Sequence, residues 1–153
     1  MIRTLLSRLF PKRIITDRTG KYPYLIRWYI IGRRYAKLPF QVLLHKFCQS
    51  DDATELHSHP WKWSIAIIIK GGYVEERRER NTKMVSSRVF KPISFNVIKQ
   101  NDYHRVELLG KVSWSIFIAG PRTDTWYFWN RGTGLTERWD RFLERTFNET
   151  NLS

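Results

Sequence analysis

The sequence predicts an all-β protein that forms one barrel-like domain with a short helix at each end. Three observations predict this fold: runs of aromatic and β-branched residues are short, turn-forming residues separate them at regular intervals, and helical spacing of apolar residues is confined to the two ends of the chain. A chain of 153 residues can bury one sizeable core and needs no second domain. We therefore expect a single domain over 1–153, with a helix at about 1–10, a barrel at about 22–130 and a helix at about 136–147.

The first expected element is an amphipathic helix. Ile2, Leu5 and Leu9 recur at helical spacing, whereas Arg3 and Arg8 fall on the other side. The segment lacks the extended apolar region and the cleavage site of a secretory signal, but it contains arginines and no acids, as a mitochondrial presequence does. We expect a short helix that packs on the barrel, with a presequence as the alternative.

The first half of the barrel is predicted from turn residues and from alternation along strands. Asp17 and Gly20 supply the side-chain bonding and the positive φ that a turn needs. After this turn, aromatic and β-branched residues favour strands at 24–31, 40–47, 57–59 and 63–70. In the second of these strands Leu43, His45 and Phe47 share a face, so His45 is expected to point into the barrel.

The second half continues the same pattern and then changes to a helix. Two charged runs, 73–80 and 84–91, flank a turn and are expected to form an exposed hairpin with its charges in solvent. Further strands are expected at 94–98, 104–109, 112–119 and 126–129. Beyond Thr136, a candidate N-cap, four apolar residues recur at helical spacing: Trp139, Phe142, Leu143 and Phe147. This helix is expected to pack outside the barrel.

The placement of the histidines is the strongest functional signal. His57 and His59 are two positions apart, and side chains alternate along a strand, so both imidazoles are expected on one side. His104 begins a second run whose same-face neighbours Val106 and Leu108 are apolar, so it turns toward the same interior. A lone histidine is more often a hydrogen-bonded core or surface residue than a ligand. Three that converge favour a metal site, because neutral imidazole is the commonest metal ligand.

Three further residues are candidates for catalysis or substrate binding. His45 has three open roles: a fourth metal ligand, an acid or base near neutral pH, or a hydrogen-bonding partner close to the site. We favour the last two. Arg27 shares a face with Leu25 and Tyr29, and an inward arginine is costly unless it meets an anion. Arg122 lies just beyond a strand end, where it is expected to hold a carboxylate or phosphate of the substrate. His45 and Arg122 are the catalytic candidates.

The histidine motifs and the short, regularly spaced strands together resemble the cupin superfamily from about 24 to 129. Three residues match the spacing of the first cupin motif: His57, His59 and Gly71. Trp63 or Ser64 occupies the place of its carboxylate, and His104 matches the histidine of the second motif, whose glycines and proline are absent. Short segments also resemble small, uncharacterised cupin-like proteins of bacteria and phages: RWY at 27–29, LHKF at 44–47, HSHPW at 57–61, GGY at 71–73, HRVEL at 104–108 and GPR at 120–122. The resemblance implies a double-stranded β-helix, the jelly-roll barrel of cupins.

The resemblance also implies a metal-dependent enzyme. A three-histidine centre without a carboxylate resembles the iron centre of thiol dioxygenases among cupins. We therefore expect a non-haem iron oxygenase with His57, His59 and His104 around Fe(II), and with Zn, Mn or Ni as alternative ions. Glu55 has the parity to share the face of His57 and is the alternative carboxylate ligand, although a surface acid at the loop edge is the favoured interpretation.

The positive charge of the chain suggests an anionic partner. A formal net charge of +13 attracts phosphate polymers or acidic surfaces in a salt-dependent way. The basic residues are spread along the chain without a groove-binding motif, so a solvated basic surface is equally consistent. The enzyme is expected to take a small or nucleotide-like anionic substrate. The alternative function is a non-catalytic module that binds nucleic acid or a phosphorylated ligand.

The last expectations concern compartment and assembly. Cys48 is the single cysteine, so no internal disulfide can form, which suits a reducing compartment and favours the cytoplasm. The apolar run at 65–69 is much too short to span a membrane. Because cupins often dimerise through sheet edges, the resemblance also suggests a homodimer.

Overall fold

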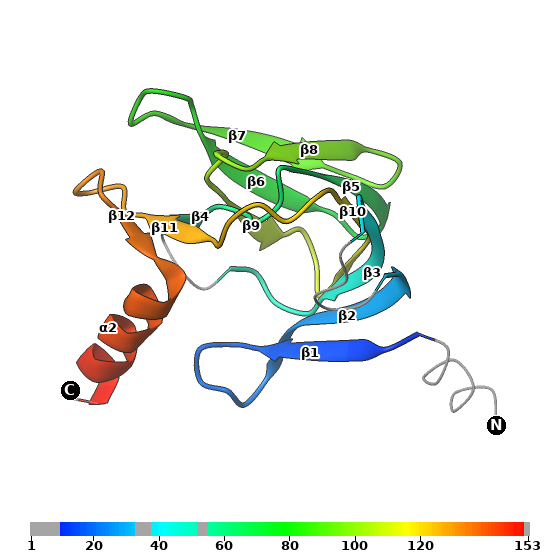
Figure 1. The fold of residues 1–153 in the computed structure, drawn as a ribbon, viewed down its shortest axis with the longest axis horizontal. Coiled ribbons are helices and arrows are strands. Elements are labelled where there is room, and N and C mark those ends of the chain that lie inside the picture. Colours follow the sequence, from blue (N-terminus) through cyan, green and yellow to red (C-terminus); the bar gives the residue numbers. More distant parts are fainter. Residues whose placement is uncertain (1–9, 33–37, 52–54, 152–153) are drawn as a thin grey trace.

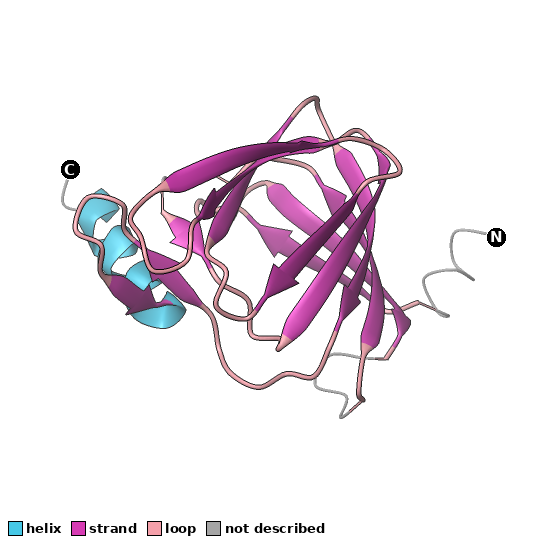
Figure 2. Cartoon of the chain, turned by 90° about the horizontal axis from the view of Figure 1, so that it is seen from above, coloured by secondary structure: helices cyan, strands magenta, loops and turns pink. Residues whose placement is uncertain are grey.

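Two six-stranded antiparallel sheets form the body of the protein in this computed structural model (Figure 1). The structure describes residues 10–32, 38–51 and 55–151. Seen from above, the strands of both sheets curve around a common interior (Figure 2). The all-β, barrel-like architecture expected from the sequence is confirmed.

The first sheet, sheet A, joins strands from both halves of the chain in the order β1-β2-β3-β10-β5-β8. In chain order these strands are β1 (Lys12–Thr16), β2 (Pro23–Ile31), β3 (Gln41–Phe47), β5 (Trp63–Lys70), β8 (Phe95–Lys99) and β10 (Ser113–Ala119). The late strand β10 lies between β3 and β5, so this sheet is held together by pairing between distant parts of the chain.

The second sheet, sheet B, has the order β12-β11-β4-β9-β6-β7. Its strands are β4 (Leu56–His57), β6 (Tyr73–Arg78), β7 (Val85–Phe90), β9 (His104–Leu108), β11 (Tyr127–Trp129) and β12 (Thr136–Arg138). The two-residue strand β4 meets β9 at one register pair, His57 opposite His104. The helix α2 (Trp139–Asn151) follows β12 directly.

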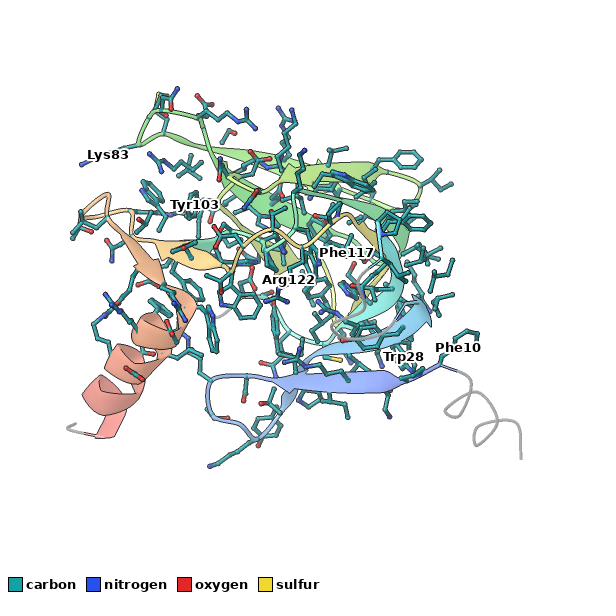
Figure 3. All side chains as sticks on the ribbon, in the orientation of Figure 1. Phe10, Trp28, Lys83, Tyr103, Phe117 and Arg122 are labelled. Atoms are coloured by element: carbon teal, nitrogen blue, oxygen red, sulfur yellow. The ribbon has the colours of Figure 1, made fainter. Side chains whose placement is uncertain are left out.

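The core lies between the inner faces of the two sheets. Along β10, for example, Phe117 and Ala119 are buried while Ile116 is exposed, which is the alternation expected of a strand with one face inward. The side chain of Phe117 is labelled in Figure 3. Ten buried residues form the main cluster: Tyr29, Leu43, Trp61, Ala66, Ile68, Tyr73, Ile98, Val106, Phe117 and Ala119.

The structure adds a strand at the N-terminal end that the sequence pattern did not predict. β1 forms a hairpin with β2, closed by the Asp17 N–H, which donates to the Tyr22 carbonyl at 2.9 Å. Gly20 adopts a φ of 72° in this turn, as its assignment to a turn requires. The expected N-terminal helix at about 1–10 falls almost entirely on residues 1–9, which lie outside the described residues.

At the C-terminal end, the helix is present but begins later than expected. Thr136–Arg138, expected to open the helix, forms β12 because its backbone pairs with β11 along three residues. The helix then runs over Trp139–Asn151, with Asp140 in its first turn, where a negative charge is favourable. No helix in the described part of the chain is both long and apolar enough to cross a membrane.

The hairpin of β6 and β7 is present, but the expectation that its charges all face solvent is wrong. β6 lies between β7 and β9, so it is an interior strand whose alternate residues face the core. Tyr73 and Glu75 are only 3% and 1% exposed. The buried Glu75 turns out to be central to the candidate site.

Candidate metal centre

The structure brings His57, His59 and His104 together, as the sequence predicted. One ring nitrogen from each residue lies within 4.8 Å of the others. The Nε2 atoms of His59 and His104 are 2.7 Å apart. All three rings lie next to one another, with centroids of neighbouring rings 4.9 to 5.3 Å apart. In the described residues this is the group of side chains best arranged to hold a metal ion.

Backbone pairing around Ser58 explains why His57 and His59 point the same way. The Ser58 N–H donates to the Tyr127 carbonyl at 2.8 Å, and the Tyr127 N–H donates to the Ser58 hydroxyl at 3.0 Å. Ser58 is buried and holds the chain extended against β11. Its two neighbours therefore project to the opposite side, where the cross-strand pair of His57 and His104 completes the cluster.

A buried carboxylate orients His104. Nδ1 of His104 lies 2.6 Å from Oε1 of Glu75. An ionised carboxylate can only accept this hydrogen bond, so Nδ1 of His104 is the donor, and Nε2, on the other side of the ring, faces His59. Metal-binding histidines commonly make this contact through the ring nitrogen that does not bind the metal. Sequence analysis missed Glu75, because both faces of 73–78 carry charged residues and alternation alone could not tell which face is buried.

Glu75 is itself held ionised by polar neighbours. Arg77 Nη2 donates to Glu75 Oε1 at 2.9 Å, and the amide of Asn96 donates to the same atom at 2.9 Å. Burial by itself raises the pKa of Glu75, but His104 and Arg77 outweigh burial and lower it to about 2. Arg77 continues the network to Asp102, whose Oδ2 lies 3.3 Å from Nη1. A chain of polar contacts therefore links Asp102 to the histidine cluster.

Burial keeps the rings of His57 and His59 neutral near pH 7. Burial lowers the pKa of His57 to about 4, although the carboxylate of Asp51 raises it. Burial also lowers the pKa of His59 well below 6.5, and the adjacent histidines lower it further. Asp51 is fixed beside His57 at 3.9 Å, because it accepts hydrogen bonds from the Val106 N–H and the Tyr24 hydroxyl. Neutral rings keep lone pairs available for a metal ion.

His45 and Arg27 form a second polar group inside the barrel. His45 is 2% exposed, as expected for an inward position on β3. Its Nε2 lies 2.9 Å from Nε of Arg27, and its ring stacks on Phe117 at 4.7 Å between centroids. The cluster of nitrogens that could share an ion consists of the other three histidines, so the structure places His45 beside the cluster. Arg27 faces inward, as its parity predicted.

Arg122 and Glu55 lie at the margin of the site. Arg122 is exposed, and its backbone forms an isolated bridge with Trp61, whose ring stacks beside His59 at 5.7 Å. Glu55 lies 3.9 Å from Arg18 and is not one of the residues whose ligand atoms converge. The favoured interpretation of Glu55 as an acid at the loop edge agrees with this position.

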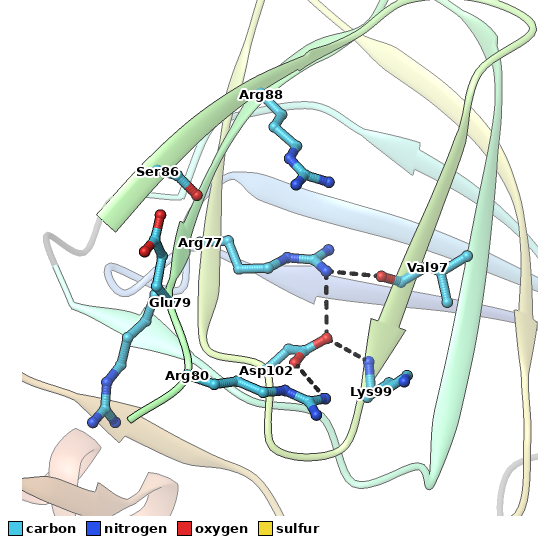
Figure 4. A pocket seen from close by; sticks show the side chains of 9 residues that line it. Arg77, Glu79, Arg80, Ser86, Arg88, Val97, Lys99 and Asp102 are labelled. Atoms are coloured by element: carbon cyan, nitrogen blue, oxygen red, sulfur yellow. Dashed lines mark hydrogen bonds and ion pairs between the residues drawn. The ribbon is translucent and has the colours of Figure 1, made fainter. Parts of the chain in front are cut away.

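A basic pocket of about 450 Å³ lies between the ends of β6, β7 and β8, apart from the three histidines (Figure 4). Its lining residues are Arg77, Arg78, Glu79, Arg80, Ser86, Arg88, Val97, Lys99 and Asp102. Asp102 is already engaged by Arg77, by Arg80 at 3.3 Å and by the Lys99 N–H at 2.9 Å. The pocket therefore keeps an excess of positive charge.

Comparison with known proteins gives likeness in structure alone. No family model matches the chain, and no curated protein matches it. The structure of FeII HppE is similar with a TM-score of 0.56 at 10% identity, over 72% of this chain and 56% of that one. A cupin-2 domain from Rhodospirillum rubrum gives 0.54 at 10% identity, over 75% and 72%. A structure of oxalate oxidase gives 0.53 at 15% identity, over 73% and 58%.

This chain spans little more than half the length of HppE and of oxalate oxidase. Identities this low establish a shared fold and leave the chemistry to be argued from the residues. The two curved antiparallel sheets, with a histidine cluster between β4 and β9, agree with that fold. The expectation drawn from the sequence motifs is confirmed at this level: the chain has the cupin fold.

Proposed function

We propose that the protein is a metal-dependent enzyme, a non-haem iron oxygenase in which His57, His59 and His104 hold a divalent ion. The observation that carries the proposal is the convergence of these imidazoles, one of them oriented by a buried carboxylate. Fe(II) is the proposed ion, and Zn, Mn and Ni are the alternatives. A protein with the same fold, HppE, has been solved in its FeII form, which supports this choice.

The donor set fits such an ion. Nitrogen ligands about 2.1 Å from one ion lie roughly 3 to 3.5 Å from each other. The three nitrogens lie within 4.8 Å of one another, and the Nε2 atoms of His59 and His104 lie 2.7 Å apart, so the separations that an ion requires fall inside the observed range. With no carboxylate in the donor set, no ligand of the ion carries a negative charge, and the nearest carboxylates, Glu75 and Asp51, act through the histidines. When bound, the ion supplies Lewis acidity and, as iron(II), a centre for O₂ activation.

The surrounding residues would control protons and substrate. Glu75 would keep a proton of His104 on Nδ1, which leaves Nε2 free to bind the metal ion. His45 is proposed as a polar helper beside the site, because its ring and the ring of His59 both lie next to Phe117. Arg122, exposed on the segment that pairs with Trp61, is proposed to contact an anionic substrate as it arrives.

Anaerobic reconstitution followed by metal analysis tests the proposal. We expect the wild-type chain to retain one ion of Fe(II), and His59→Ala to retain less than about a tenth as much. His45→Ala, which removes a buried imidazole outside the cluster, is expected to fall between these two and to keep the ion with reduced affinity. A wild-type protein that takes up no Fe, Mn, Ni or Zn refutes metal binding. An iron-loaded protein that forms no nitrosyl signal with nitric oxide refutes the oxygenase part.

A second candidate function is the binding of a phosphorylated ligand at the basic pocket. The guanidinium ends of Arg77, Arg80 and Arg88 turn toward the same space in Figure 4. Guanidinium groups bind phosphate oxygens in pairs, so several that converge suit a phosphate group. The residues that line the pocket carry only part of the net positive charge of the chain. They give the alternative function, binding of a phosphorylated ligand, a specific location.

Titration with inorganic phosphate and with short DNA and RNA over a salt series separates the possibilities. Phosphate binding at the pocket is expected to weaken roughly tenfold in Arg88→Gln. The control Arg141→Gln, on the exposed side of α2, should leave it unchanged. Equal effects of the two substitutions mean that anions bind the basic surface at large. Binding of DNA or RNA that weakens steeply with salt would favour nucleic acid instead.

A further inference from the structure

The outer face of sheet A is apolar, although it faces away from the core. A sheet with one buried face usually carries apolar residues inward and polar residues outward. In β5 the inward positions include two small buried residues, Ser64 and Ala66, whereas Ile65, Ile67 and Ile69 point outward. The outward positions of β10 are equally apolar: Trp114, Ile116 and Ile118.

Strand register joins these residues into continuous rows. One row crosses β2, β3, β10, β5 and β8 in that order: Trp28, Leu44, Ile116, Ile67 and Phe95. A second row crosses the last four of these strands: Val42, Ile118, Ile65 and Val97. Strands about 4.8 Å apart, with rows about 7 Å apart, give these residues roughly 300 Å² in projection. An apolar surface patch of this size is often functional, and we refer to these two rows as the outer patch.

The corner of the outer patch next to the turn between β7 and β8 is the most exposed. Phe95 is 63% exposed, and Ile93, in the turn before it, is 87% exposed. The exposed Ile69 on β5 lies close to this turn, because the Ile93 N–H donates to the Ile68 carbonyl at 2.9 Å. Three large apolar side chains therefore protrude into solvent at this corner.

Ile93 occupies a backbone position that favours glycine. The turn consists of Lys91, Pro92, Ile93 and Ser94, and the Ser94 N–H donates to the Lys91 carbonyl at 3.1 Å. Ile93 has a φ of 72°, where a turn with proline second normally holds Gly or Asn, because a β-branched residue is strained there. The side chain gains almost no burial that would offset this strain. An exposed isoleucine kept at such a position indicates contact with something outside the molecule.

The charges around the outer patch are positive. Within the described residues, the six strands of sheet A contain no Asp or Glu. Lys46 lies over the ring of Trp114 at 5.4 Å, and Lys70 is paired opposite the same residue. Lys91 and Lys99, at the two ends of β8, are exposed. The outer patch therefore has a basic border with no acid in its strands.

This combination of apolar and basic groups selects among possible partners. A bilayer that contains anionic lipids offers hydrocarbon for the apolar side chains and phosphates for the lysines. A second copy of the chain would bring the same positive charges against the patch, which is unfavourable. Nucleic acid would neutralise the lysines but offers no apolar phase for aliphatic side chains such as Ile93.

We propose that the outer patch is a membrane-docking surface, where Ile69, Ile93 and Phe95 enter the apolar region of an anionic bilayer and the bordering lysines contact lipid headgroups. The protein would bind by one face of sheet A and would not span the bilayer. Docking is independent of metal binding, because the three-histidine cluster lies inside the barrel.

Co-sedimentation of the full chain with lipid vesicles tests the proposal. We expect binding to vesicles that contain phosphatidylserine to be at least about tenfold tighter than to vesicles of phosphatidylcholine alone, and to weaken as salt rises. Ile93→Gly is expected to weaken this binding about tenfold, because it removes one side chain that the bilayer buries. The same variant should resist urea at least as well as the wild type, because glycine adopts the positive φ without strain.

Leu135→Gly is the matched control. Leu135 is also strongly exposed and lies in the connection between β11 and β12, which belong to sheet B. This variant should bind vesicles as the wild type does, whereas Phe95→Ser should lose binding as Ile93→Gly does.

Four results would overturn the docking surface. They are a wild-type protein that does not sediment with phosphatidylserine vesicles, equal binding to phosphatidylcholine alone, equal losses in Ile93→Gly and Leu135→Gly, and a dimer in analytical ultracentrifugation that Phe95→Ser dissociates. The last result would make a second copy of the chain the occupant of the patch.

Discussion

Replacement of Glu75 by glutamine tests whether the buried carboxylate tunes the metal centre. The substituted amide keeps the size of the side chain and an oxygen that can accept from His104 Nδ1, but it removes the charge that polarises this ring. Losing such a partner typically weakens metal affinity by roughly ten- to a hundredfold. We therefore expect the Zn(II) affinity of Glu75→Gln to fall within that range, while the number of ions bound per chain stays the same.

The same substitution should also lower stability. Removing one charge of a buried ion pair lowers the free energy of unfolding by roughly 3 to 5 kcal/mol, because the other charge is left buried without a partner. Arg77 keeps its contact with Asp102 and its side chain is 22% exposed, so the loss should be smaller, about 2 kcal/mol. Urea denaturation of metal-free protein measures this loss independently of the metal.

Glu76→Gln provides the control, because Glu76 is the next residue on β6 and faces the other way, toward Arg105 and Arg131. Competition with a chelator of known affinity gives the zinc affinity of each variant. If Glu75→Gln binds zinc as tightly as the wild type and as Glu76→Gln, the contact with His104 has no role in metal binding and the reasoning is refuted.

Three other expectations follow from the same geometry. Alanine at any one of the cluster histidines, His57, His59 or His104, should abolish high-affinity metal binding, whereas Glu55→Gln should leave it intact; equal loss in a metal titration would make Glu55 a ligand. Because the pKa of His57 is lowered from 6.5 to about 4 in the folded state, the unfolded chain binds more protons between these values, and His57 alone should cost the metal-free protein about 3 kcal/mol as the pH falls from about 6.5 to 4. His59, whose pKa is also lowered, adds to this loss, and flat stability over this window in denaturant titrations contradicts the assignment. Phe142→Ala should cost roughly 3 to 5 kcal/mol, since Phe142 is 1% exposed and stacks on Phe128 at 3.9 Å; a thermal unfolding temperature equal to that of the wild type would show that α2 is not part of the cooperative fold.

Parity along strands predicted most of the histidine arrangement. His45, His57, His59 and His104 all follow a local rule, the alternation of side chains, and neighbouring apolar residues mark which face is inward. The cluster therefore follows from the sequence once the strands are assigned. The same rule placed Arg27 inward, although it could not show that its Nε would meet His45.

The features that were missed depend on pairing between distant segments. β12 is a strand because β11 lies beside it, which outweighs the helical spacing that begins near Thr136. Glu75 is buried because β9 covers one edge of β6 and β7 covers the other. A run with charges on both faces carries no local signal for such a position. The acid that orients His104 thus became visible only when the sheet was assembled.

The single register pair between β4 and β9 has a consequence for how the protein folds. In the part of the chain that the structure describes, strand pairing in sheet B passes from β9 to β11 and β12 through the two residues of β4 alone, and it meets β9 at the pair of His57 and His104. An ion bound by both His57 and His104 would link segments that are far apart in the chain, at the point where one pair of residues joins β4 to β9. Amide exchange in β11 should therefore slow when metal is added, while exchange in β5 should hardly change. The chain would then acquire its full rigidity only after it has captured the ion.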